Sequence, residues 1–227
     1  MLVPPGMRML LALALLLAAA PAGADPADQL AARTDVPHHE LGIRIGGYGF
    51  RRDGDARPGD GWTACRMNGF GVFGTRTVTG PLFVEAGLDM YTSANVENAM
   101  DLPIDRTSGL VSAAVGARTN IGRYLRGYVQ VGGGVELTRV SVPYGEERLR
   151  DAKVMPEGFF GAGFDLRLWE GTYVGTSLRA LMMGNFDYDP ERLDPDGGWV
   201  APPPASEVFD ASASVATQVQ FYVRRAL

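Results

Sequence analysis

Residues 81–92 read PLFVEAGLDMYT, and within this stretch apolar side chains occupy every second position. The apolar residues that share one face are Leu82, Val84, Ala86, Leu88 and Met90. The residues between them include a glutamate and an aspartate. Because successive side chains of an extended chain point to opposite faces, this alternation predicts a β-strand with one wholly apolar face.

Seven other segments repeat this alternation, which is weaker and rich in glycine in the first two. They are Leu41–Arg52, Ala64–Val78, Ser108–Ile121, Tyr124–Val140, Glu157–Trp169, Thr172–Gly184 and Phe209–Arg225. The last is about as long as a tilted membrane strand, which needs some 9–11 residues or slightly more. The sequence therefore predicts about eight strands.

The connections between these segments alternate in length. Short links lie at 79–80, 120–123 and 170–171, and long polar links lie at 53–63, 93–107, 141–156 and 185–208. Outer-membrane barrels have short periplasmic turns and long extracellular loops, and an even number of strands leaves both termini in the periplasm. We predict an all-β fold: a closed antiparallel up-and-down transmembrane β-barrel of about eight strands over residues 41–227.

The polar faces decide which side of the wall meets lipid. Small residues such as Gly116, Gly163 and Ser112 lie on the polar faces and leave room for arginine side chains inside a narrow tube. Strands of ten or more residues also exceed the usual length of about 5–6. We therefore predict apolar faces toward lipid and a charged lumen. The predicted lumen charges are Arg44, Arg76, Glu85, Asp89, Arg118, Arg126, Glu136, Asp165, Arg167, Arg179 and Arg224.

Charges inside a narrow tube need partners, so these residues predict a structural salt-bridge network. Pairing between adjacent strands would join Glu85 to Arg118 and Asp165 to Arg179. An eight-stranded barrel is just wide enough for side chains to fill it. That width argues against an open pore and leaves a gated or very narrow path as the alternative.

Together these features resemble the small outer-membrane barrels of the OmpA/OmpX type. The resemblance covers essentially all of the chain after Glu40 and is architectural. It implies recognition of the last strand by the barrel-assembly machinery and contact with outer-membrane lipid and lipopolysaccharide. Members of that superfamily typically end in an aromatic residue, whereas this chain ends in Arg224-Arg225-Ala226-Leu227, with Phe221 and Leu227 keeping the alternation.

The N-terminus has the layout of a cleaved secretory signal over residues 1–24. Arg8 precedes an apolar run that ends before Ala22-Gly23-Ala24. Residues 25–40 are predicted to be a periplasmic lead-in. The expected location is the bacterial outer membrane, reached by export through the periplasm. Cys65 is the only cysteine, so an internal disulfide is excluded.

Catalytic chemistry is not expected. Barrel enzymes of this architecture pair a histidine with serine or aspartate, whereas His38 and His39 are the only histidines and precede the first predicted strand. No cofactor is expected, and the net charge of −5 argues against nucleic-acid binding.

Several carboxylates gather in the last long link: Asp187, Asp189, Glu191, Asp194 and Asp196. Oxygen ligands of this kind suit Ca²⁺, but their order does not match the helix-loop-helix calcium motif. A solvated acidic loop is the first interpretation, and a calcium site that reaches lipopolysaccharide phosphates is the alternative.

Three functional hypotheses follow from these observations. The first is a non-enzymatic integral barrel that contributes to the envelope or presents its extracellular loops to partners, which the sequence does not name. The second is narrow-pore or lateral transport of a small or apolar solute. The third is a soluble periplasmic ligand-binding barrel.

Overall fold

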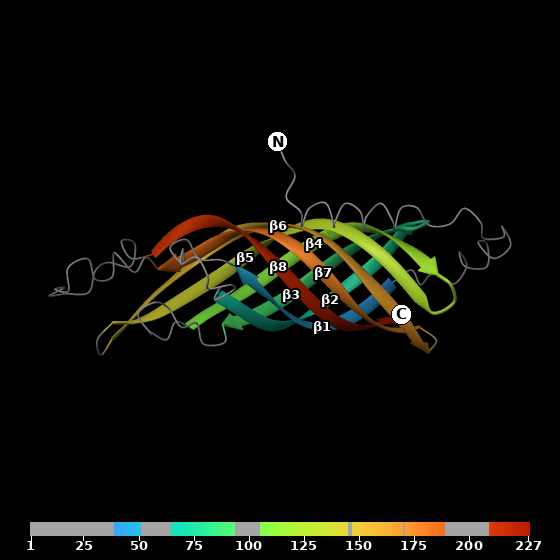
Figure 1. The fold of residues 1–227 in the computed structure, drawn as a ribbon, viewed down its shortest axis with the longest axis horizontal. Coiled ribbons are helices and arrows are strands. Elements are labelled where there is room, and N and C mark those ends of the chain that lie inside the picture. The colour runs from blue at the N-terminus through green and yellow to red at the C-terminus, as the bar shows by residue number, and fades with distance from the viewer. Residues whose placement is uncertain (1–38, 51–64, 94–104, 145–146, 170, 189–208) are drawn as a thin grey trace, which may run out of the picture.

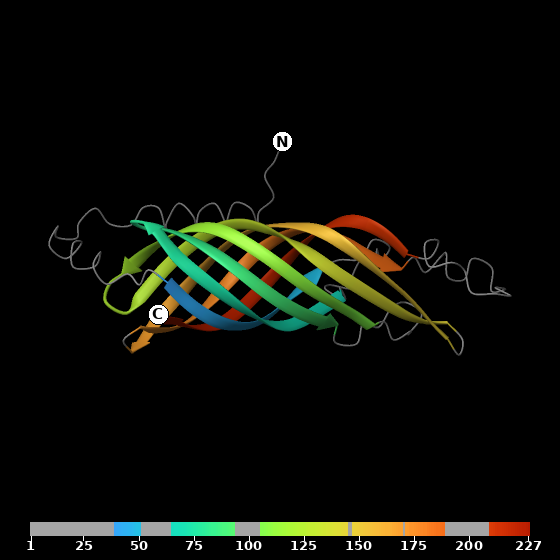
Figure 2. The same cartoon turned by 180° about the vertical axis from the view of Figure 1, so that it is seen from behind.

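The computed structural model describes residues 39–50, 65–93, 105–144, 147–169, 171–188 and 209–227, which form a closed barrel of eight antiparallel strands (Figures 1 and 2). The strands are β1 (His39–Phe50), β2 (Cys65–Thr79), β3 (Leu82–Ser93), β4 (Asp105–Ile121), β5 (Leu125–Tyr144), β6 (Glu147–Trp169), β7 (Thr172–Tyr188) and β8 (Phe209–Ala226). Each strand pairs with its neighbours in the chain, and β1 pairs with β8.

The pairing of β1 with β8 closes the ring. It runs without a break from Glu40↔Ala226 to Phe50↔Ala216. Beyond it, the Leu227 amide donates to the His39 carbonyl at 3.0 Å. A ring without edges leaves no row of unpaired backbone groups along its wall, the condition for a sheet that crosses hydrocarbon. The prediction of a closed up-and-down barrel is confirmed.

Three tight turns join β2 to β3, β4 to β5 and β6 to β7 at one end of the barrel. Each places a glycine in the left-handed region, with φ of 50° at Gly80, 72° at Gly122 and 72° at Gly171. Residues with a Cβ rarely adopt this conformation, which explains the glycine in each short link. The connections 51–64, 94–104 and 189–208 leave from the opposite end and lie outside the described residues.

The link between β5 and β6 differs from the prediction of a long loop over 141–156. Here the two strands continue as a hairpin until Tyr144 pairs with Glu147. Its two arms extend beyond the neighbouring strands in both views (Figures 1 and 2). Val140 and Val142 remain buried on the inward face. The polar and proline residues of this segment suggested a loop, but the period of two continues through them.

The N-terminal boundary also differs from the prediction. β1 begins at His39, so Glu40 belongs to the barrel and its side chain is buried. Both residues belong to the segment predicted to be the periplasmic lead-in. Residues 1–38, including His38 and the predicted signal segment, lie outside the described residues. Among the described residues, no helix is long and apolar enough to cross a membrane, a finding that concerns helices only.

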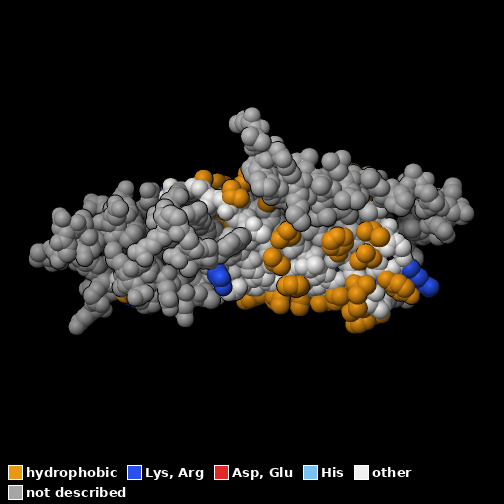
Figure 3. All heavy atoms as spheres, in the orientation of Figure 1, with side chains coloured by type: hydrophobic (Ala, Val, Ile, Leu, Met, Phe, Trp, Pro, Cys, Tyr) orange, Lys and Arg blue, Asp and Glu red, His pale blue; other side chains and the backbone are white. Residues whose placement is uncertain are grey.

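Apolar side chains cover the outside of the wall. Val115 and Val131 form a direct cross-strand pair and are 57% and 54% exposed. Orange apolar side chains occupy the visible middle of the wall, while blue cationic ones lie toward its two ends (Figure 3). Large apolar side chains exposed over most of a wall mark a surface that faces lipid.

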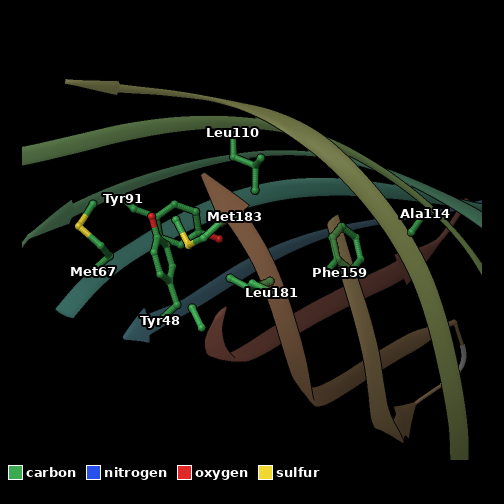
Figure 4. Packing of buried hydrophobic residues seen from close by; sticks show 9 residues of the cluster. Tyr48, Met67, Tyr91, Leu110, Ala114, Phe159, Leu181 and Met183 are labelled. Atoms are coloured by element: carbon green, nitrogen blue, oxygen red, sulfur yellow. The ribbon is translucent and has the colours of Figure 1, made fainter. Parts of the chain in front are cut away.

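The half of the lumen away from the tight turns contains an apolar cluster (Figure 4). Its members are Tyr48, Met67, Tyr91, Leu110, Ala114, Phe159, Leu181, Met183 and Ala216. The rings of Tyr48 and Tyr91 pack edge to face with centroids 5.1 Å apart. Such pairs contribute about 0.5–1.5 kcal/mol beyond burial.

We expect Val131→Arg to lower the fraction of protein that folds into lipid vesicles. An arginine on the lipid face costs about 2–4 kcal/mol near the bilayer midplane. Val131→Ala is the control, because it shortens the side chain but stays apolar. The heat-dependent shift in gel mobility reports the folded fraction, and equal fractions for the two variants would contradict the assignment of this face to lipid.

Candidate functional site

The charged lumen is the candidate site, and the structure buries nine of the eleven residues predicted to line it. They are Arg44, Glu85, Asp89, Arg118, Arg126, Glu136, Asp165, Arg179 and Arg224. The barrel also buries three charged residues that the prediction omitted, namely Glu40, Arg106 and Glu157. The described lumen thus contains six arginines and six carboxylates.

Arg76 and Arg167 require correction. Alternation along β2 points Phe73 and Thr75 inward, so Arg76 between Thr75 and Thr77 points outward and is exposed. Arg167 lies at the bulged end of the β6–β7 pairing and is only half-buried. Both residues lie at the tight-turn end, where Arg76 is on the outer face and Arg167, which keeps the inward phase of Asp165, lies at the mouth of the lumen.

Glu40 is the centre of the ion-pair cluster nearest the tight turns. Its Oε2 accepts hydrogen bonds from Arg118 Nη1 at 3.0 Å and Thr75 Oγ1 at 2.9 Å, and its Oε1 accepts from Arg126 Nη1 at 3.0 Å. Arg224 Nη1 lies 3.3 Å from the same Oε2. One carboxylate therefore contacts arginines from β4, β5 and β8.

Asp165 is the second carboxylate of this cluster. Its Oδ2 accepts from Arg126 Nε at 2.8 Å and also contacts Arg224 Nη2, while Tyr222 donates to Oδ1 at 2.6 Å. Charge-assisted hydrogen bonds of this kind are stronger than neutral ones. Three arginines share two carboxylates here, so the cluster carries a net charge of +1.

Arg44 organises the middle of the lumen. It binds Asp89 through two hydrogen bonds, Nε to Oδ1 at 2.6 Å and Nη2 to Oδ2 at 2.5 Å, and its Nη1 donates to Glu85 at 2.8 Å. Arg179 donates to the same oxygen of Glu85 at 2.8 Å. With its amide oxygen turned toward Arg179, Gln130 accepts at 2.8 and 3.0 Å. This cluster is electrically balanced.

The predicted pairs Glu85–Arg118 and Asp165–Arg179 are wrong. Glu85 lies opposite Ala114, four residues from Arg118, and binds Arg44 and Arg179 across the lumen. Asp165 lies opposite Gly175, four residues from Arg179. The register decides the partners, and long arginine side chains in a narrow barrel reach strands that are not neighbours.

Aromatic rings fix the planes of these arginines. The guanidinium carbon of Arg126 lies 4.1 Å from the ring centroid of Tyr173, and that of Arg179 lies 4.5 Å from Phe159. Arg224 lies over Tyr128 at 5.6 Å. Cation–π contacts contribute about 0.5–2 kcal/mol, with the higher values at desolvated sites. The arginines are thus held by both charge and packing.

Glycines make the space for this packing. A Cβ at Gly71 would collide with Asp89 Oδ1, and one at Gly87 would collide with Arg44 Nη2. The close approach of the side chains to the wall therefore depends on missing side chains in β2 and β3.

The buried charges at the opposite end of the lumen from the tight turns do not cancel. Glu136 Oε1 accepts from Tyr48 at 3.0 Å and from Thr138 at 2.9 Å, whereas its buried Oε2 has no hydrogen-bond partner among the described residues. Within the same ranges, Glu157 forms neither a hydrogen bond nor an ion pair, although it is buried. With Arg106 as the buried cation of this level, the described charges sum to −1.

The remaining predicted positions carry no site in the described structure. His39 is exposed at the start of β1. Asp187 lies in β7, but its side chain is outside the described part of the structure. The other four carboxylates lie wholly outside the described residues: Asp189, Glu191, Asp194 and Asp196. Among the described residues, no group of three or more metal-ligating side chains is present.

A protein-family model identifies the fold. The model described as "Outer membrane protein beta-barrel domain" matches residues 10–195, most of the chain. The chain belongs to this outer-membrane β-barrel family. Its location is therefore the bacterial outer membrane, and for a barrel of this kind we expect the tight turns to face the periplasm. The soluble periplasmic alternative is set aside.

The chain also matches solved structures at low sequence identity. The Neisserial surface protein A is 9% identical, with a TM-score of 0.55 over 84% of this chain and 97% of its own. Ail of Yersinia pestis is 15% identical, with a TM-score of 0.43 over 82% and 99%. The Escherichia coli protease OmpT is 8% identical, with a TM-score of 0.39 over 83% and 96%. No curated protein sequence matches the chain.

We expect Glu85→Gln to lower the unfolding temperature in detergent, because it leaves Arg44 and Arg179 short of a buried partner. Breaking a buried pair from one side costs about 3–5 kcal/mol. Adding Arg179→Gln should recover part of the loss, while adding Arg118→Gln should give an additive effect within about 0.5 kcal/mol. Partial recovery with Arg118→Gln instead would show that the described pairing is incorrect.

We expect Glu40→Gln to cost about 3–5 kcal/mol, because Arg118 then loses its described carboxylate partner and Arg126 and Arg224 keep only Asp165. Asp105→Asn is the matched control, since it breaks an Arg148–Asp105 bridge whose side chains are 39% and 68% exposed. Exposed bridges contribute about 0–1 kcal/mol. Thermal unfolding in detergent compares the two, and equal losses would argue against a buried Glu40.

Proposed function

We propose that this protein is a non-enzymatic integral barrel that strengthens the outer membrane and presents its extracellular connections to partners. The observation that carries the proposal is the filled lumen. Two ion-pair clusters, one around Glu40 and Asp165 and one around Arg44, cross the barrel at successive levels. A lumen crossed in this way supports a structural role rather than free passage of solutes.

The rings between the two clusters support the same role. Phe73 packs edge to face on Tyr222 at 5.6 Å, and Phe83 packs on Tyr128 at 6.0 Å. These four buried rings form one apolar cluster. It lies among the arginines, so the periplasmic half of the lumen is packed with both charge and apolar surface.

The surroundings of two buried serines, Ser108 and Ser177, support a non-enzymatic protein. Hydrolytic catalysis with serine needs a base within hydrogen-bond reach of the hydroxyl. Ser177 donates to the Gln220 side chain at 3.2 Å, and Ser108 shares a hydrogen bond with Thr138 at 3.1 Å. His39, the described histidine, is exposed at the periplasmic end, whereas Ser108 lies in the extracellular half.

One observation favours narrow transport as the second candidate. Buried polar atoms in the lumen, including Ser214 Oγ, Gln218 Oε1 and Gln220 Nε2, have no hydrogen-bond partner among the described residues. Buried polar groups of this kind are commonly satisfied by ordered water. A hydrated extracellular half would extend to the Arg44 cluster, where the described ion pairs block further passage.

Planar-bilayer recording tests the proposed closed lumen. We expect the folded wild-type protein to insert without discrete conductance steps. Steps would favour transport, and their loss of cation preference in Glu136→Gln/Glu157→Gln would place the current inside the barrel. Hydrolysis of phospholipid or peptide by the folded protein that is abolished in Ser177→Ala would contradict the non-enzymatic role.

A further inference from the structure

The extracellular edge of the apolar wall can be located on β5 and β6. The outward apolar positions of β5 run from Leu125 to Leu137, about 12 residue steps. At about 3.3 Å per residue and a tilt of about 40°, this span covers about 30 Å, enough to cross the apolar band of about 25 Å that outer-membrane barrels have. Leu137 pairs with Val154, and the two side chains are 51% and 61% exposed. This pair marks the outer boundary of the band.

The outward face becomes basic immediately beyond this pair. Arg139 is the next outward residue of β5, about 7 Å further along the strand. It pairs with Ala152, and Arg150 pairs with Ser141, so the two arginines are diagonal neighbours. Cβ atoms in this relation lie about 7–8 Å apart or somewhat closer. Two exposed guanidinium groups can therefore converge on one small anion.

The nearby carboxylates whose side chains the structure describes, Asp105 and Asp151, do not pair with these two arginines. Asp105 binds Arg148 at 2.6 Å, and Arg148 also donates to Ser141 at 3.1 Å, which ties the hairpin to β4. Asp151 accepts from the Ala152 amide at 2.7 Å. Among the described residues, Arg139 and Arg150 have no hydrogen-bond or ion-pair partner. The exposed Thr107 lies opposite Arg139 on β4 and offers a hydroxyl donor.

We propose that Arg139 and Arg150 bind a phosphate group of the outer leaflet, carried by the lipid A portion of lipopolysaccharide. The guanidinium group presents paired donors that match phosphate oxygens. The site lies at headgroup height, directly above apolar side chains that contact the acyl chains of the same lipid. The inference rests on the outer-membrane location and is independent of whether the lumen conducts or the protein has an enzymatic activity.

Binding of defined lipids in an uncharged detergent tests the site. The wild-type protein is titrated with bisphosphorylated lipid A, with the same lipid stripped of phosphate, and with inorganic phosphate. Arg139→Gln/Arg150→Gln removes the site. Arg76→Gln/Arg225→Gln is the matched control, because these exposed arginines lie on the same outer surface at the periplasmic end.

We expect the Arg139→Gln/Arg150→Gln protein, the hairpin variant, to bind bisphosphorylated lipid A at least about tenfold more weakly than the wild type. Each interfacial basic residue contributes about a fivefold change in affinity. The control should change affinity less than about twofold. Removing the phosphates from the lipid should lower the affinity of the wild-type protein as much as the two substitutions of the hairpin variant do. Arg139→Lys/Arg150→Lys, which keeps the charge and the fold, should retain part of the affinity.

Three outcomes would overturn the site. Equal losses in the hairpin and control variants would indicate general electrostatic attraction to the barrel. Equal binding of lipid A with and without phosphate would show contact with acyl chains alone. Inorganic phosphate binding as tightly as lipid A would indicate an anion site unrelated to lipid. The heat-dependent gel shift confirms that every variant compared is folded.

Discussion

Backbone hydrogen bonding in a medium without water is the constraint on which the rest of this structure depends. Hydrocarbon offers no partner for an open sheet edge, and the pairing of β1 with β8 removes the two edges that eight strands would otherwise leave. Once the sheet is closed, period-two alternation divides every strand between lipid and lumen. The apolar exterior and the charged interior follow from the same geometry.

The interior shows how a narrow barrel accommodates twelve buried charges. Six arginines and six carboxylates balance overall but not level by level. The cluster around Glu40 has one excess positive charge, the cluster around Arg44 is neutral, and the level of Glu136 and Glu157 has one excess negative charge among the described residues. Aromatic faces and bare glycine backbone fill the space between these groups. The result is a periplasmic half of the lumen that is packed with ion pairs and aromatic rings.

The sequence predicted the architecture well because alternation and link length are local properties. These two properties were enough to predict the number of strands, the positions of the tight turns and the closed up-and-down topology. The partners of Glu85 and Asp165 were not, because they depend on register and on reach across the lumen, which no local pattern contains. Glu40 was missed although it shares the period of two with Arg44, and the hairpin beyond Val140 was hidden by its polar composition. Arg76 follows the inward-facing Thr75, so the same alternation places it on the outer face and not in the predicted lumen.

The pairing of β1 with β8, here called the seam, is also the contact that completes the barrel during assembly. Because β1 and β8 are partners, the wall stays an open sheet until β8 has joined β1. Glu40 sits in the first of these strands and Arg224 in the last, and their contact forms only across the finished seam. A chain that ended before Phe209 would leave two strand edges exposed and three arginine contacts of Glu40 reduced to two. Closure of the barrel therefore depends on β1 and β8 together, the two described strands that lie furthest apart in the sequence.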